Sequence, residues 1–260
     1  MDAQLAPDVT FGFVLIVVAF ASAVKAALGF GFPLIAVPLA ANLIGARPAV
    51  VLIAIPVVFS NFLILVRGGG SAEELRRFAA MLVGVVGGTF IGAQLLGRLD
   101  PGVVSLIVGI AAVLLAVLSW GNLMPPISPT VHRVAGPTVG VAAGVLGGAT
   151  GIYAPLIAAY VHALQVDKRA FVYWLTAAFF LGGGAQVVSY WRLGLYSWKL
   201  VTYAVATFVP VVVGTWWGFW IQDRLSVTLF RRLVLLLVLF AGLRLVWPGF
   251  QLVWSRMVGR

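Results

Sequence analysis

Ten apolar stretches follow one another along this chain of 260 residues and leave little sequence between them. Most are long enough to cross a hydrocarbon core of about 30 Å as helices. The chain is 62% hydrophobic and 9% charged, too few charges for the surface of a water-soluble protein of this size. Lipid is therefore the expected solvent for most of the chain. The stretches lie at 10–28, 29–46, 49–66, 78–96, 102–120, 134–150, 152–164, 171–190, 199–221 and 229–247.

These stretches predict helices rather than strands. Membrane-spanning β-strands are about ten residues long and alternate in polarity, whereas these stretches are longer and apolar on every face. The predicted fold class is all-α, a polytopic membrane protein with about 8 to 10 membrane segments, of which eight are full crossings and two are short or broken. The first stretch has no basic region or cleavage pattern of a signal peptide before it, so we expect it to be retained.

Two parts of the chain resemble each other. A shift of 122 positions aligns 29–36, GFGFPLIA, with 151–158, GIYAPLIA. With shifts of 125 and 126 the alignment continues. It then pairs Asn61 with Gln186, Gly88 with Gly214 and Gly92 with Gly218. The predicted organisation is a first transmembrane repeat over 1–120, a linker over 121–133, and a second repeat with a short tail over 134–260.

Each repeat consists of a hairpin broken by glycine and proline, at 10–46 and 134–166, followed by three crossings. Each repeat therefore makes an odd number of passes, so the second is predicted to be inverted relative to the first. Inverted repeats with broken helices at matching positions are typical of secondary transporters, which bind their substrate near the middle of the membrane.

The two hairpins carry a family resemblance. The segments 28–38, LGFGFPLIAVP, and 147–156, GGATGIYAPL, resemble the TauE/SafE family of membrane permeases, also called the sulfite exporter or toluene-sulfonate uptake permease family. The resemblance covers essentially the whole chain. It implies secondary transport of a small sulfur-containing anion, such as sulfite, a sulfonate or sulfoacetate, across the bacterial cytoplasmic membrane. The substrate, the direction and the coupling ion are not specified by the sequence.

The hairpin turns are the first candidate site. In each hairpin a glycine turn precedes a proline in the predicted first turn of the next half-helix, and the unpaired amides of that turn can bind an anion. The turns place Gly29, Gly31, Gly151 and Tyr153 at the predicted substrate site. The alternative is that these glycines only permit close packing of helices.

Three polar side chains inside apolar stretches complete the predicted site. Lys25 carries a charge that is costly in a membrane unless it meets an anion, water or the interface. If 10–28 crosses fully, Lys25 lies about 23 Å along it and can instead extend to the headgroups. Asn61 and Gln186 occupy matching positions and could line the site, or could connect packed helices.

Other classes of function are disfavoured. All seven acidic residues lie in termini or loops, so the membrane interior lacks the carboxylates of a cation relay or an aspartyl protease. There is no cysteine, and His132 and His162 lack the spacing of metal ligands. We therefore expect no enzyme activity, metal or cofactor. The net charge of +10 comes from residues in short loops, where lipid headgroups and topology explain it better than nucleic acid does.

Glycines also recur every four residues at 84, 88 and 92, at 140, 144 and 148, and at 214 and 218. Such faces are most simply packing surfaces within the chain, with a homodimer interface as the second expectation. The predicted partners are thus a small anion, the lipid bilayer and a second copy of the chain. The alternative to a transporter is a membrane scaffold or accessory subunit that transports nothing.

Overall fold

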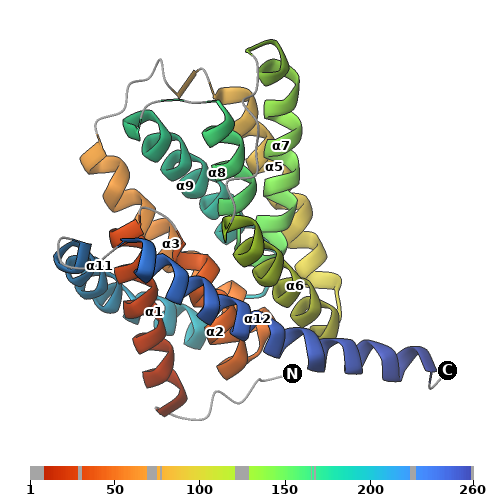
Figure 1. Cartoon of the computed structure of the whole chain (residues 1–260). Helices are drawn as coiled ribbons and strands as arrows, with labels where there is room; N and C mark the ends of the chain where they lie inside the picture. The colour runs from red at the N-terminus through yellow and green to blue at the C-terminus, as the bar shows by residue number, and fades with distance from the viewer. Residues whose placement is uncertain are drawn as a thin grey trace.

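The computed structural model describes residues 9–28, 31–68, 75–76, 78–120, 129–164, 166, 168–222 and 227–258 (Figure 1). In this part of the chain the regular structure is entirely helical, which confirms the predicted fold class. The helices are α1 (Val9–Leu28), α2 (Phe32–Ile44), α3 (Ala46–Gly68), α5 (Ala79–Arg98), α6 (Pro101–Trp120), α7 (Pro129–Thr150), α8 (Ala154–Ala163), α9 (Lys168–Arg192), α10 (Trp198–Ala206), α11 (Phe208–Gln222) and α12 (Val227–Val258).

Five helical segments are long and apolar enough to cross a membrane, as judged by length and composition over the described residues. They are Val9–Ala27, Ala46–Val66, Ala79–Arg98, Arg169–Arg192 and Trp198–Trp220. Three shorter apolar segments accompany them: Phe32–Ile44, which is α2, Pro101–Leu114 within α6, and Leu235–Gln251 within α12. The chain is thus a multi-pass membrane protein, with at least five candidate crossings among the residues that the structure describes.

Two details differ from those predicted. The crossing predicted over 199–221 is present as the candidate span Trp198–Trp220, but its helix is interrupted at Thr207, which separates α10 from α11. Pro210 in the first turn of α11 has no N–H to continue the hydrogen bonding of α10, which accounts for the break. The second difference is the start of α7, which begins with Pro129, inside the range 121–133 predicted as a linker. Proline is well suited to the first turn of a helix.

The short helices α2 and α8 each follow a turn that contains a glycine of positive φ. Gly31, at φ 106°, precedes α2, and Gly151, at φ 78°, lies between α7 and α8. A proline then occupies the first turn of each short helix. With 13 and 10 residues, α2 and α8 are about 20 and 15 Å long, which is too short to cross the hydrocarbon core alone.

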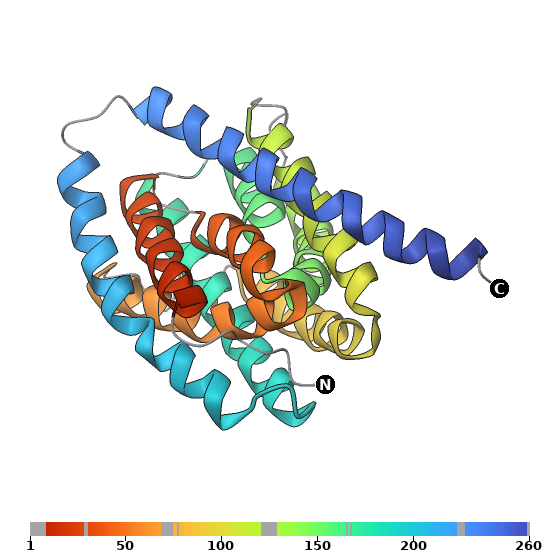
Figure 2. The same cartoon turned by 90° about the horizontal axis from the view of Figure 1, so that it is seen from below.

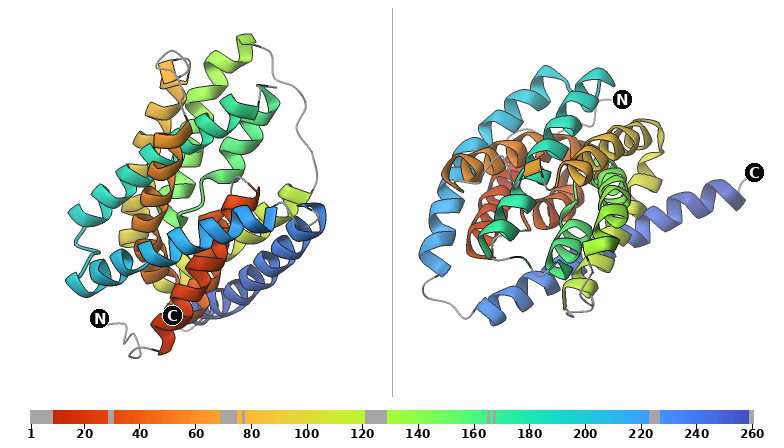
Figure 3. Two further views of the ribbon diagram at one scale, coloured as in Figure 1. Left: turned by 90° about the vertical axis from the view of Figure 1, so that its left-hand side faces the viewer. Right: turned by 90° about the horizontal axis from the view of Figure 1, so that it is seen from above.

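The buried side chains form two clusters. The larger one is built mainly from α1, α2, α3, α6 and α12, and the smaller one from α5, α7, α8 and α9. In Figure 1 the helices α7, α8 and α9 lie in the upper part and α1, α11 and α12 in the lower part, and the side view in Figure 3 separates them in the same way. The division does not follow the two sequence halves, because α5 packs with helices of the second half.

Glycine faces hold the most closely packed helix pairs together. On α5, a Cβ atom on Gly88 would overlap the carbonyl oxygen of Val141 on α7, and Gly84 and Gly92 meet the same helix. On α11, Gly214 and Gly218 meet the backbone of α1 at Ala19 and Ala23 in the same manner. These glycine faces are therefore occupied within the chain, and they offer no surface for the homodimer that was the second expectation.

The two glycine contacts correspond to each other under the sequence alignment. Gly88 aligns with Gly214 at a shift of 126, and Val141 is 122 positions after Ala19. Under this alignment α5 corresponds to α11 and α7 to α1, so the pair α5–α7 corresponds to the pair α11–α1. In each pair, one helix comes from the first half of the sequence and one from the second. Two further pairs, α3 with α9 and α6 with α12, join helices that are counterparts of each other (Figure 2).

Aromatic side chains mark the ends of the lipid-facing surface formed by α10 and α11. Trp198 is 79% exposed at the start of α10, and Trp216, Trp217 and Trp220 are exposed near the end of α11. If the helices were straight, residues 198 and 220 would lie about 33 Å apart, close to the thickness of the hydrocarbon core. Exposed tryptophans at this separation are typical of side chains that anchor a protein at both membrane interfaces.

Candidate functional site

Lys25 is buried in the last part of α1, with 7% of its surface exposed. Its Nζ atom donates hydrogen bonds to Oγ of Ser60 at 2.9 Å and to Oδ1 of Asn61 at 2.7 Å, both on α3. Ser60 and Asn61 are themselves buried. The cation that could have extended to the headgroups therefore lies inside the helix bundle.

The carbonyl oxygen of Val57 orients both partners of Lys25. The Ser60 hydroxyl donates to it at 3.0 Å and Nδ2 of Asn61 donates to it at 2.8 Å. With their donors used in this way, both side chains turn oxygen acceptors toward Lys25. One turn of α3 thus supplies a preorganised site for an ammonium group.

The charge of Lys25 is not neutralised by these partners, because Ser60 and Asn61 are both neutral. Asp100, just before α6, is the one carboxylate in the described part of the chain. A lysine ammonium has three N–H donors, and the described partners accept two of them. The site can therefore accept an anion that supplies both a hydrogen-bond acceptor and a negative charge. Within the same residues, no group of three His, Cys, Asp or Glu side chains could hold a metal ion.

Gln186 takes part in a second polar network, at the end of α7. Its Nε2 atom donates to the carbonyl oxygen of Gly147 at 3.1 Å and to the hydroxyl of Tyr190 at 2.6 Å. The Tyr190 hydroxyl in turn donates to the carbonyl oxygen of Gly148 at 2.6 Å. Carbonyls in the last turn of a helix lack helical partners, and the Gly147 carbonyl also accepts from the backbone N–H of Gly151 at 2.6 Å, so Gln186 and Tyr190 add to the C-terminal cap of α7 from α9.

Tyr153 fills the space beside Gly147. Its ring occupies the position that a side chain on Gly147 would take, and it also packs against Gly182 on α9. The Tyr153 hydroxyl donates to the carbonyl oxygen of Gly182 at 3.2 Å and accepts from Oγ1 of Thr89 at 3.3 Å. Tyr153 therefore connects the turn before α8 with α5, α7 and α9.

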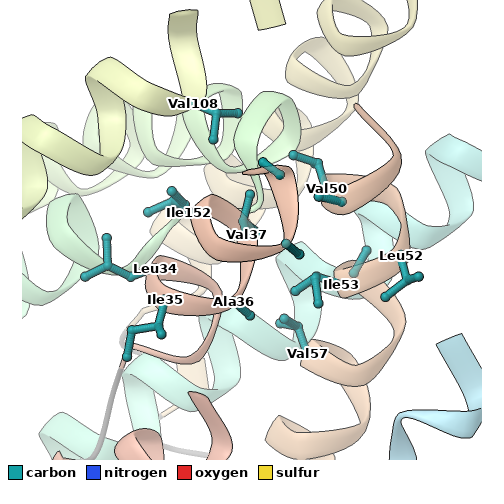
Figure 4. Close-up of a cluster of buried hydrophobic side chains, with 14 of the residues drawn as sticks. Leu34, Ile35, Ala36, Val37, Val50, Leu52, Ile53, Val57, Val108 and Ile152 are labelled. Carbon is teal, nitrogen blue, oxygen red and sulfur yellow. The ribbon is translucent and has the colours of Figure 1, made fainter. Parts of the chain in front are cut away.

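The turn between α7 and α8 packs directly against the first hairpin. A Cβ atom on Gly151 would lie 3.3 Å from Cγ2 of Val37 on α2 and 4.0 Å from Nε2 of Gln186. Figure 4 shows the next residue, Ile152, among side chains of α2 and α6, including Leu34, Val37 and Val108. The second hairpin thus meets the first in the larger buried cluster.

The predicted site residues fall into two groups. Lys25 contacts Asn61, whereas Gly151, Tyr153 and Gln186 lie around the end of α7. Gly31 precedes α2, six residues after Lys25. Gly29 lies outside the described residues. Asn61 binds Lys25 and Val57, whereas Gln186 binds Gly147 and Tyr190, so each hydrogen-bonds within its own predicted repeat.

Ser60, Gly182 and Tyr190 belong to these networks but were not singled out from the sequence. Ser60 is a lone hydroxyl in an apolar stretch, and it gives no periodic signal. Gly182 contributes a backbone oxygen, which any residue type could supply. Tyr190 lies four positions after Gln186 on α9, and this helical spacing could have revealed it.

Comparison with known proteins gives one match. The family model described as Sulfite exporter TauE/SafE matches residues 14–245, which include all the described residues of both networks. No curated protein and no solved structure matches the chain. Because the match covers most of the 260 residues, the chain belongs to the sulfite exporter TauE/SafE family.

Proposed function

We propose that this protein is a secondary transporter that moves a small sulfur-containing anion across the bacterial cytoplasmic membrane. Membership of a family of sulfur-anion transporters supports the class of function. One observation carries the proposed site: the buried ammonium group of Lys25, held by Ser60 and Asn61, has neutral partners among the described residues.

The cost of burying a charge supports an anion as the missing partner of Lys25. An ion that leaves water for a low-dielectric interior is destabilised by several kcal/mol unless it is paired and hydrogen-bonded. Two neutral acceptors solvate the Lys25 ammonium but do not neutralise it. Sulfite or a sulfonate group carries a negative charge and several oxygen acceptors, so it would both neutralise the Lys25 ammonium and accept its remaining hydrogen bond.

The start of α2 would add a second attraction. The N-terminus of a helix presents free amides and partial positive charge to an anion. Gly31 and the first residues of α2 follow Lys25 closely in sequence, after the end of α1 at Leu28. In contrast, both N–H donors of the Gln186 amide are occupied in the second network. We therefore assign the anion to Lys25, Ser60, Asn61 and the start of α2.

Alternating access is the proposed mechanism, with the two repeats inverted relative to each other. The correspondence of the pair α5–α7 with the pair α11–α1 supports this symmetry. So does the antiparallel packing of α3 and α9, where Val58 meets Gly183 and Phe62 meets Phe180. In our proposal the helices around the two buried clusters move relative to each other as rigid bodies. Lys25 is buried as it stands, so a relative movement would be needed to expose the anion.

Transport by reconstituted protein tests the function. The purified chain would be placed in liposomes, and uptake of radiolabelled sulfite, an aryl sulfonate and sulfoacetate would be measured against a carboxylate. We expect saturable uptake of at least one sulfur-containing anion. Lys25→Met should reduce its initial rate by about tenfold or more, since a charge-assisted hydrogen bond contributes about 1.5–3 kcal/mol.

The matched control is Lys199→Met, because Lys199 is an exposed lysine whose ammonium group lies over the ring of Tyr203. Its substitution should leave the rate within about twofold of wild type, as expected for an exposed charge. No uptake of any anion by folded protein, with no thermal stabilisation by any of them, would contradict the proposal. That result would favour the alternative of a scaffold or accessory subunit.

A further inference from the structure

The outer face of α5 carries a groove that is separate from both polar networks. Its volume is about 650 Å³, and it runs from Leu75 and Arg76, just before α5, to Phe90, with Leu181 of α9 on its wall. Apart from Arg76, the residues that line it are apolar. The groove is thus an apolar channel with one cationic side chain at its end.

The groove faces the lipid. Gly84 and Gly88 lie on the side of α5 that packs against α7, whereas Val83 in the groove is 72% exposed. A Cβ atom on Gly87, which lines the groove, would meet nothing within 4 Å. Because hydrocarbon surrounds this face of a membrane protein, the material that fills the groove must be apolar.

The length of the groove corresponds to one leaflet of the bilayer. Ala79 and Phe90 are eleven residues apart, which is about 17 Å along a helix. Half of a hydrocarbon core is about 15 Å thick. Arg76 lies three residues before Ala79, at the N-terminal end of the crossing, where headgroups are expected. A lipid chain that followed the groove from this end would reach the middle of the membrane.

We propose that the groove binds an acyl chain of an anionic phospholipid, with the lipid phosphate on the guanidinium group of Arg76. Guanidinium and phosphate form paired hydrogen bonds, and basic side chains beside membrane helices bind anionic headgroups. A phosphatidylcholine headgroup would bring a cation near Arg76 and should bind less well than phosphatidylglycerol.

Native mass spectrometry of the full chain, incubated in detergent with either lipid, tests this proposal. We expect phosphatidylglycerol to be retained about fivefold better than phosphatidylcholine. Arg76→Gln should abolish that preference. The control Arg192→Gln changes another exposed arginine, at the end of α9, and should preserve it. Equal retention of the two lipids by the wild-type chain would overturn the proposal.

Filling the groove tests the acyl-chain part. Gly87→Leu should reduce retention of both lipids about fivefold, since it occupies part of the space for the chain. Gly12→Leu is the matched control, because Gly12 on α1 also has no atom within 4 Å of its Cβ position. If Gly87→Leu fails to fold, Val83→Trp fills the same groove from an exposed position. Retention equal to that of Gly12→Leu would overturn the proposal.

A second copy of the chain is the competing occupant. The chain has no cysteine, so Val83→Cys introduces a single thiol in the groove. We expect this variant to stay monomeric under oxidising conditions in lipid. Rapid formation of a disulfide-linked dimer would show that a second copy covers the groove, and it would overturn the lipid assignment.

Discussion

Lys25 on α1 donates a hydrogen bond of 2.7 Å to Asn61 on α3, although the two residues are 36 positions apart. Their aligned counterparts, Gly147 and Gln186, are also joined by a hydrogen bond, from Nε2 of Gln186 to the Gly147 carbonyl at 3.1 Å. The same two positions thus meet in both repeats. The first predicted repeat places a cation at these positions and the second a backbone carbonyl, so the charge of the proposed anion site is not duplicated at the aligned positions.

Asn61→Asp should weaken anion binding, because the new carboxylate would take the place of the anion beside Lys25. The new carboxylate would lie beside the Lys25 ammonium and act as a permanent counter-ion in a low-dielectric environment. We expect the variant to fold and to bind the transported anion about tenfold or more weakly, as measured by thermal shift against anion concentration. Anion affinity equal to that of wild type would contradict the role given to this pair.

Gly88→Ala and Gly214→Ala should both destabilise the protein, because each added Cβ would overlap a backbone carbonyl of the neighbouring helix. Overpacking of this kind costs about 1–3 kcal/mol. Gly184→Ala on α9, where a Cβ meets nothing within 4 Å, is the control and should be neutral or slightly stabilising. Thermal unfolding in detergent measures all three, and equal midpoints would show that these contacts are not closely packed.

Tyr190→Phe should destabilise the end of α7. It removes the hydroxyl that donates to the Gly148 carbonyl and accepts from Gln186, and it leaves buried polar groups without a partner. The expected loss is about 1–3 kcal/mol of unfolding free energy. Tyr203→Phe is the control, since that ring stacks with Phe11. A destabilisation of similar size in both variants would argue against the capping role.

Much of the fold could be predicted because the length of an apolar stretch limits what it can form in lipid. The predicted ranges 10–28 and 78–96 match α1 and α5 to within about two residues. The break at Thr207 inside the span Trp198–Trp220 was not predicted, because hydropathy is high on both sides of it. Pro210 is the sequence feature that could have revealed it.

The candidate site was predictable residue by residue but not as a set of contacts. Lys25 and Asn61 stood out because a polar group in hydrocarbon needs a partner, yet that argument does not specify which partner. Because Asn61 and Gln186 align, the sequence predicts that they either line one site or connect packed helices. In the structure each contacts its own repeat, since alignment relates positions by symmetry and does not bring them together.

The role of Lys25 in anion binding is tested by the dissociation constants of the transported anion for the wild type, Lys25→Met and Lys199→Met. Isothermal titration of the purified proteins would give all three values. We expect one anion per chain for the wild type and for Lys199→Met, with affinities within about twofold of each other. For Lys25→Met we expect a loss of affinity of about tenfold or more. Equal affinity of Lys25→Met and wild type would contradict the assignment of the anion to Lys25.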